Sequence, residues 1–182
     1  MEHSLRVPVS QLRLYQARYD ASVLEADLEI YREVAKKQRY LTTQQLYEIC
    51  RWKSPRRAKN VFRNSEEFAK EITAFSFGAT QEESRIGSLA LLSGVEFPTA
   101  SVILHYCVDA SYPILDVRAI WSLGVKQPAQ YTFLFWKEYM ALCRSIANEN
   151  SMSVRELDMA LWQYSKEHQP ALEPSQHKHR KK

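Results

Sequence analysis

The chain has 182 residues, of which 45% are hydrophobic and 12% aromatic, enough for one domain with a real core. Only 4 glycines and 7 prolines argue against a loop-rich all-β protein. The formal net charge is +4, and the same charge is carried by the tail cations Lys178, Arg180, Lys181 and Lys182. Residues 1–177 are therefore close to neutral, which speaks against a broadly basic surface and leaves a basic tail and local patches.

The cysteines and the apolar segments limit the class further. Cys50, Cys107 and Cys143 are widely spaced and lie among apolar residues, which predicts buried free thiols rather than a zinc knuckle or a redox pair. The start of the chain is polar and mixed, and no apolar run approaches the roughly 20 residues of a membrane helix. We expect a soluble, monomeric protein of the cytoplasm, nucleoid-associated if the source is bacterial.

The first half of the chain predicts helices. Apolar residues fall at helical spacing through residues 22–37. "QQLYEICRW" follows Thr42 and predicts a short helix, and "SPRRAKNVF" predicts a turn with Pro55 at a first helical position. Ser65 precedes "EEFAKEITAF", whose two acids stand in the first turn, where the helix dipole favours them.

Two capping boxes mark helices in the second half. Residues 80–83 (TQEE) predict a helix that reaches Leu92, and residues 153–156 (SVRE) predict one that ends near Glu167. Between them, "YTFLFWKEYMALCRSIANEN" predicts a long helix whose aromatic residues pack in the core. No alternating strand pattern occurs. The sequence predicts a single all-α domain of about nine helices over residues 1–169, followed by a disordered basic tail at 170–182.

The most apolar stretch, residues 91–124, contains a predicted hairpin at about 91–99. Gly94 fits a turn that needs unusual backbone angles. Pro98 suits the first turn of the next helix, because its missing N–H has no intrahelical partner there. The free N–H groups at the start of that helix point into the turn and form a natural phosphate site.

Within this stretch, "LSGVEFPTASVILHY" followed by "YPILDVRAIWSLG" resembles the helix-hairpin-helix DNA glycosylase superfamily, the group of endonuclease III and the adenine glycosylases. The family hairpin has the form L-P-G-V-G-x-x-T-A, and an apolar helix then leads to a phrase ending in the catalytic aspartate. The resemblance covers about residues 84–124, and Asp116 falls at the family's spacing. It implies a glycosylase-like helical fold and base-excision repair of a damaged or mismatched base in double-stranded DNA.

The resemblance also implies roles for individual residues. Asp116 takes the place of the carboxylate that stabilises positive charge on the deoxyribose and activates a nucleophile. Gly94, Val95 and the amides around Thr99 take the place of the DNA-backbone anchor, often with a bound monovalent cation. The target base must leave the stack, so the fold needs a cavity between its helix groups.

Three departures from the family pattern narrow the prediction. Pro98 stands where bifunctional enzymes carry a lysine, which excludes Schiff-base chemistry from that position and implies a monofunctional glycosylase without a lyase step. Glu96 replaces the second hairpin glycine, and a glutamate beside a phosphate is electrostatically unfavourable. The four closely spaced cysteines of the family's iron–sulphur cluster are absent, so no such cluster is expected, and apart from the monovalent cation at the hairpin the resemblance implies no cofactor or metal.

Several residues also have a purely structural interpretation. Asp116 could be an ordinary N-cap, worth about 1 kcal/mol. Trp52 lies in the densest basic cluster, and could stack on a base or pack in the core. That cluster, which could contact phosphates or form a solvated helix end, comprises Arg51, Lys53, Arg56, Arg57 and Lys59. Arg118 could contact a phosphate or join a surface ion pair. His105 is expected in the core or at the pocket edge.

The main alternative function is a non-catalytic DNA-binding or interaction protein that retains the glycosylase-like fold, and Glu96 is the best sequence argument for it. A third interpretation, a helical protein acting on another nucleoside or on a protein partner, has no specific support. The tail "HKHRKK" could add salt-sensitive DNA affinity or could only increase solubility.

Overall fold

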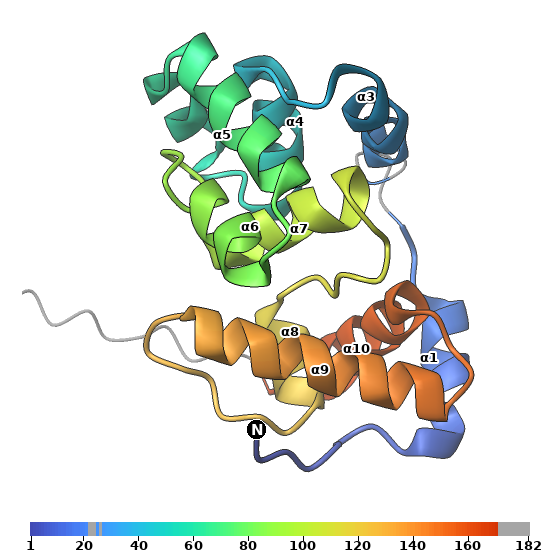
Figure 1. Ribbon diagram of the computed structural model, residues 1–182. Helices are drawn as coiled ribbons and strands as arrows, with labels where there is room; N and C mark the ends of the chain where they lie inside the picture. Colours follow the sequence, from blue (N-terminus) through green and yellow to red (C-terminus); the bar gives the residue numbers. More distant parts are fainter. Residues whose placement is uncertain (22–24, 26, 171–182) are drawn as a thin grey trace, which may run out of the picture.

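The computed structural model describes residues 1–21, 25 and 27–170. This part of the chain is helical and contains no β-strand, which confirms the all-α prediction. The helices form two groups, one above the other in Figure 1. The elements in chain order are η1 (Val9–Gln11), α1 (Leu12–Arg18), η2 (Asp27–Glu29), α3 (Ile30–Gln38), α4 (Thr43–Lys53), η3 (Ala58–Arg63), α5 (Glu66–Gly78), α6 (Glu82–Leu89), α7 (Phe97–Cys107), α8 (Val117–Ser122), α9 (Phe133–Glu149) and α10 (Val154–His168).

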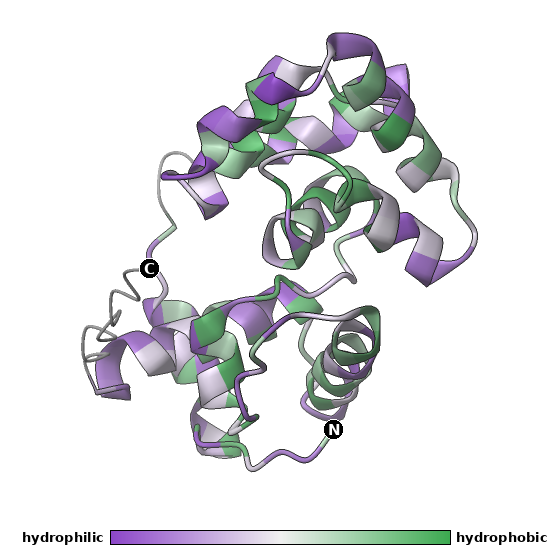
Figure 2. Ribbon diagram, turned by 90° about the vertical axis from the view of Figure 1, so that its left-hand side faces the viewer, coloured by the Kyte–Doolittle hydropathy of each residue, from purple (hydrophilic) through white to green (hydrophobic). Residues whose placement is uncertain are grey.

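The first group consists of α3 to α7, with α7 at its centre. Most helices of the protein carry hydrophobic and hydrophilic positions on different faces (Figure 2). In contrast, α7 is apolar almost all round, and every residue from Thr99 to Cys107 is buried. A helix of this kind is stable only when neighbours cover all its sides. Helices α3, α4 and α6 provide that cover.

The second group joins α1 to the last three helices. Helix α1 packs along α10, which also contacts α8 and α9. The segment before α1 is bound to the end of α8, where the Ser4 amide donates to the Leu123 carbonyl at 3.1 Å and the Arg6 amide to the Ser122 carbonyl at 2.8 Å. Gly124 ends this turn with a φ of +67°, and a Cβ there would lie 2.0 Å from the Ser4 carbonyl oxygen.

The predicted helix starts are largely correct. The capping box of Ser153 and Glu156 is present, and Ser65 caps α5 by accepting from the Phe68 amide. Thr42 forms a further capping box with Gln45 at the start of α4. Of the helix predicted over residues 22–37, the second half is observed as α3, while residues 22–24 and 26 lie outside the described residues.

Two local predictions were wrong. The capping box at residues 80–83 does not form, because α6 begins only at Glu82, after Gln81. The Arg85 guanidinium instead donates to the carbonyls of Phe77 and Ala79 and fixes the turn between α5 and α6. The predicted turn at Pro55 is present, but Pro55 lies within this turn and not at a first helical position, and the 3-10 helix η3 follows it.

Two further predictions concern the chain end and membranes. The tail predicted to be disordered lies, apart from residue 170, outside the described residues. Among the helices that the structure describes, none combines the length and the apolar character needed to cross a bilayer.

Candidate active site

A pocket of about 250 Å³ lies where the two helical groups meet. Its volume is just below the roughly 300–1,000 Å³ typical of sites for drug-sized ligands, so it suits a small ring system. The first group contributes the end of α4, and the second contributes α10 and the segment before α8. Its lining comprises Tyr19, Asp20, Glu25, Trp52, Lys53, Ile114, Asp116, Arg155, Asp158 and Trp162.

Asp116 lies in this pocket and also caps α8. Its Oδ1 accepts a hydrogen bond from the Arg118 amide at 2.8 Å, which confirms the N-cap interpretation. Its Oδ2 accepts from Lys53 Nζ at 2.6 Å. The Asp116 side chain remains 21% exposed and that of Lys53 10% exposed, so both groups reach the pocket. Capping therefore orients the carboxylate without sealing it in the core.

The ionisation of Asp116 is controlled by opposing effects. Burial by itself would raise the pKa of the carboxyl group. The positive charge and the hydrogen bond of Lys53, together with the amide and the charge of Arg118, outweigh burial and lower the pKa below its ordinary value. Asp116 is consequently a carboxylate at neutral pH.

Ile114 and Leu115, which precede Asp116, are held in place by hydrogen bonds to their backbone. The Leu115 amide donates to Ser101 Oγ at 2.8 Å, and the Tyr139 hydroxyl donates to the Ile114 carbonyl at 3.0 Å. Both partners are buried, one in α7 and the other in α9. The two helical groups thus hold the same short segment from opposite sides.

His105 holds the start of that segment. Its Nδ1 lies 2.8 Å from the Tyr112 carbonyl oxygen, which can only accept, so the ring nitrogen donates. Burial lowers the pKa of His105, although the hydrogen bond opposes this effect. The neutral, enclosed ring confirms the prediction of a core histidine.

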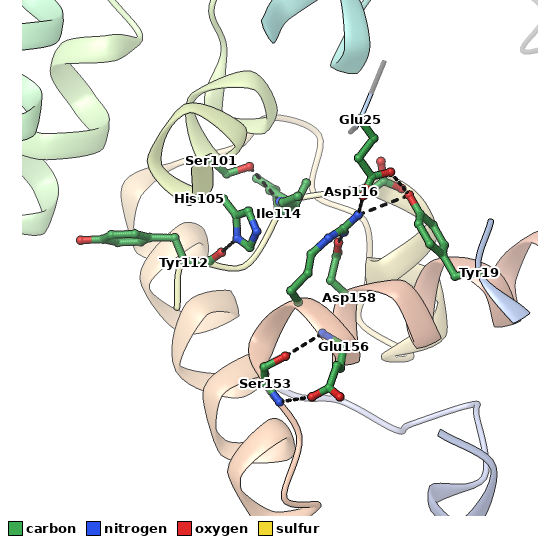
Figure 3. A network of polar contacts seen from close by, with 12 residues as sticks. Tyr19, Glu25, Ser101, His105, Tyr112, Ile114, Asp116, Ser153, Glu156 and Asp158 are labelled. Carbon is green, nitrogen blue, oxygen red and sulfur yellow. Dashed lines mark hydrogen bonds and ion pairs between the residues drawn. The ribbon is translucent and has the colours of Figure 1, made fainter. Parts of the chain in front are cut away.

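The wall beside Asp116 contains a compact charged network. Arg155 donates to Glu25 and to Asp158 and lies 3.4 Å from the Tyr19 hydroxyl, which itself donates to Glu25 at 2.6 Å (Figure 3). Burial raises the pKa of Asp158, while the Arg155 charge partly offsets that effect. This wall offers both hydrogen-bond donors and acceptors to a polar ring.

Aromatic rings form the remaining walls. Trp52 is half-buried and packs edge-to-face on Tyr106, with centroids 6.2 Å apart. It lines the pocket rather than lying fully in the core. Trp162 lines the other side, and the Arg118 guanidinium lies 5.4 Å from its ring centroid. Flat apolar surfaces of this kind suit stacking of a planar ring.

The hairpin lies next to this pocket. Gly94 has the positive φ that the sequence predicts, at +87°, and sits against the Val61 backbone of η3. The Asn64 side chain accepts from the Ser93 amide at 2.9 Å and donates to its carbonyl at 3.1 Å, which fixes the turn. Val95 and Thr99 are buried, and the predicted contacts of both residues with DNA stay predictions.

The hairpin borders a second pocket of about 100 Å³, which Lys53 also lines. At its rim, Glu96 forms an exposed ion pair with Arg57. The φ of Glu96 is −112°, so this residue does not adopt a positive φ. Arg56 is exposed beside Arg57, and the predicted contacts of both residues with DNA stay predictions.

The described residues contain no group of three or more His, Cys, Asp or Glu side chains that could hold a metal ion. The three cysteines are free and buried, as the sequence predicts. Burial raises the pKa of Cys50 to about 12, so this thiol is protonated and unreactive at neutral pH.

Sequence reasoning missed much of the pocket. The contact between Lys53 and Asp116 joins residues that are distant in the chain and has no local signature. A signal was available in α10, where Arg155, Asp158 and Trp162 follow at spacings of three and four and so share one face. Comparisons with family models, with curated proteins and with solved structures gave no match for this chain.

Proposed function

We propose that this protein is a DNA glycosylase of base-excision repair with a helix-hairpin-helix glycosylase-like fold, which hydrolyses the N-glycosidic bond of a damaged or mismatched base. The supporting observation is the position of Asp116, an ionised and oriented carboxylate in an aromatic-walled pocket beside the hairpin. Hydrolysis leaves positive charge on the deoxyribose as the base departs, and such a carboxylate stabilises that charge.

The neighbouring features fit the same proposal. A base rotated out of duplex DNA would stack against Trp52 or Trp162 and present its polar edge to Arg155 and the groups around it. The phosphate beside it would meet the hairpin, where α7 offers the Phe97 and Thr99 amides; Pro98 has no N–H. No amine stands on the hairpin itself, so base release proceeds with water as nucleophile.

The test is base release from a panel of duplex oligonucleotides, each with one damaged or mismatched base. The Asp116→Asn variant keeps the cap and removes the charge, so we expect the rate to fall at least about 100-fold, as for loss of one key electrostatic group. Asp109→Asn is the matched control, because Asp109 is exposed and caps only the Ser111 amide. A panel without base release, or an Asp116→Asn variant with full activity, contradicts the proposal.

A second candidate is a non-catalytic DNA-binding or interaction protein with the same architecture. The contact between Lys53 and Asp116 favours it, because an ion pair between the two helical groups could serve a structural purpose alone. In that case duplex DNA would bind at low salt with no base release. Absence of binding at low salt would contradict both the glycosylase and the DNA-binding form of the second candidate.

A further inference from the structure

Three cations of the second helical group lie over tryptophan rings. The Arg118 guanidinium lies 5.4 Å and the Lys166 ammonium 5.2 Å from the ring centroid of Trp162. The Arg6 guanidinium lies 4.8 Å from the ring centroid of Trp121. Within the described part of the chain, none of these three cations forms an ion pair with a carboxylate. Their positive charges therefore remain available to an anion from outside.

These five residues form one continuous surface, which we call the basic aromatic strip. Arg118 and Trp121 are one turn apart on the solvent-facing side of α8, and Trp162 and Lys166 are one turn apart on α10. The two helices pack against each other, and the contact of Arg118 with Trp162 joins them. Both tryptophan rings are half-buried, so each keeps part of its surface accessible. The strip begins at the pocket, which Trp162 lines, and continues over α8 to Arg6.

The basic aromatic strip differs in charge from the rest of the protein. The chain outside its basic tail is close to neutral, whereas the strip contains three cations and no acid. Glu167, the acid that follows Lys166, is paired with Arg18 at 2.9 Å. Asp116, at the pocket end of the strip, is paired with Lys53. The acids nearest in sequence are thus occupied by other cations, which leaves a local positive surface beside flat aromatic rings.

We propose that the basic aromatic strip binds a single-stranded nucleic acid, with bases against the two indole rings and phosphates against the three cations. Rings and cations alternate along the strip as bases and phosphates alternate along a strand, and every base has a face that can stack on an aromatic side chain. An acidic peptide offers carboxylates but no regular series of planar rings. A duplex keeps its bases stacked inside, so it presents its phosphates but not its base faces to the strip.

The inference goes beyond base release. The hairpin belongs to the first helical group and the basic aromatic strip to the second, and the pocket lies where the groups meet. A strand on the strip continues into the pocket at Trp162, so unpaired nucleotides next to the target base are held as well. Binding to the strip needs no reaction, so it can be tested apart from the proposed function. DNA and RNA strands share the chemistry of bases and phosphates, and the test includes one of each.

The test measures binding of undamaged strands to the full chain. Labelled oligodeoxythymidine, oligouridine and a DNA duplex of the same length are each titrated with the protein, and both anisotropy and tryptophan emission are followed. We expect the single strands to bind more tightly than the duplex. They should also quench the tryptophan emission, because a stacked base lies directly against an indole ring. The tighter of the two single strands shows which sugar the strip prefers.

Variants of the strip separate stacking from charge. Trp162→Leu should weaken single-strand binding by roughly 5- to 150-fold, the range for loss of one base–aromatic stack, and Trp162→Phe should lose less because it keeps a ring. Lys166→Gln and Arg6→Gln change exposed residues at the two ends of the strip. Each should make the slope of log affinity against log salt concentration shallower by about 0.7, the contribution of one phosphate contact on a single strand. Lys137→Gln, at an exposed lysine of α9, is the matched control and should leave the slope unchanged.

Several outcomes would overturn the inference. Duplex binding as tight as single-strand binding, or binding without quenching of tryptophan emission, contradicts stacking on the strip. Polyglutamate that displaces the strand as well as unlabelled oligonucleotide does would assign the strip to an acidic peptide. An unchanged slope in Arg6→Gln would confine the strand to the pocket.

The same experiment distinguishes this inference from the proposed function. Single-strand binding that depends on the strip, without base release from any lesion, supports the inference and contradicts the glycosylase proposal. Base release without single-strand binding supports the glycosylase proposal and overturns the inference.

Discussion

Lys53 and Asp116 face each other across the junction of the two helical groups, with Nζ and Oδ2 2.6 Å apart. Lys53 is the last residue of α4, and Asp116 is the cap of α8. The contact thus joins the end of one helix to the beginning of another that belongs to the other group. Neither charge is fully enclosed, and the Lys53 charge helps to keep Asp116 ionised in its partly buried position.

The Lys53 charge is expected to determine the ionisation of Asp116. In Lys53→Met the charge and the hydrogen bond that oppose burial most strongly are lost, so the pKa of Asp116 should rise relative to the wild type. In Lys53→Arg the cation is retained and the pKa should stay lowered. Carboxyl-carbon NMR titration measures this directly. Asp109 is the internal control, because its lowered pKa arises first from the Ser111 amide and should be the same in all three proteins.

The lowered pKa of Asp116 also predicts the direction in which stability changes with pH. The pKa of Asp116 is lower in the folded protein than the ordinary value of 3.8, so the folded state binds this proton less readily than the unfolded chain. The contribution of Asp116 to stability is therefore present above pH 3.8 and is lost as the pH falls through the lower folded pKa.

Urea unfolding across this acidic range checks the sign. Asp116→Asn should lose this part of the pH dependence and should be less stable than the wild type at neutral pH. Asp158, whose pKa is raised by burial, contributes with the opposite sign, because its stabilisation is present below the ordinary pKa and is lost as the pH rises. A wild-type slope that Asp116→Asn leaves unchanged would refute the assignment to Asp116.

The ion pair of Glu96 with Arg57 is expected to limit DNA binding at the hairpin. Glu96→Gln should free the Arg57 guanidinium for a phosphate and so raise the affinity for duplex DNA. The slope of log affinity against log salt concentration should become steeper by about the contribution of one phosphate contact. Arg57→Met should weaken binding and make the slope shallower by a similar amount. Fluorescence anisotropy at several salt concentrations measures both. Glu83→Gln, at an exposed position of α6, is the control and should behave as the wild type.

Gly124 and Gly87 form a matched pair for stability. Gly124→Ala forces a positive φ on alanine and places a Cβ against Ser4, so unfolding free energy should fall by at least about 1–2 kcal/mol. Gly87→Ala introduces a Cβ with no heavy atom within 4 Å inside helix α6. It should raise stability by up to about 1 kcal/mol. Equal effects of the two substitutions in chemical unfolding would show that the contact at Ser4 is absent in solution.

The parts of the fold that depend on local chemistry could be predicted from the sequence. Ser153 and Ser65 cap the helices that follow them because a hydroxyl reaches the nearby amides irrespective of tertiary structure. Gly94 adopts a positive φ for an equally local reason. The prediction of a capping box before α6 failed because Arg85, a residue inside α6, donates hydrogen bonds to the carbonyls at the end of α5.

The pocket could be predicted only in part. The resemblance to the glycosylase family singles out Asp116, and its capping role follows from its residue type. Lys53, Tyr19 and Trp162 reach the same pocket from α4, from the segment after α1 and from α10. The periodicity of one helix does not indicate which distant helix it will pack against. Contacts between residues far apart in the chain can therefore be identified only in the packed structure.

The way α1 packs has a consequence for the order of folding during synthesis. Helices α3 to α7 are contiguous in the chain and pack around the buried helix α7, so they can assemble as soon as α7 is made. Helix α1 is made earlier, but its partner α10 is made last among the described helices. We expect α1 to stay undocked on the nascent chain until then. Because the pocket needs residues from both groups, the protein should acquire a complete site only at this final docking step.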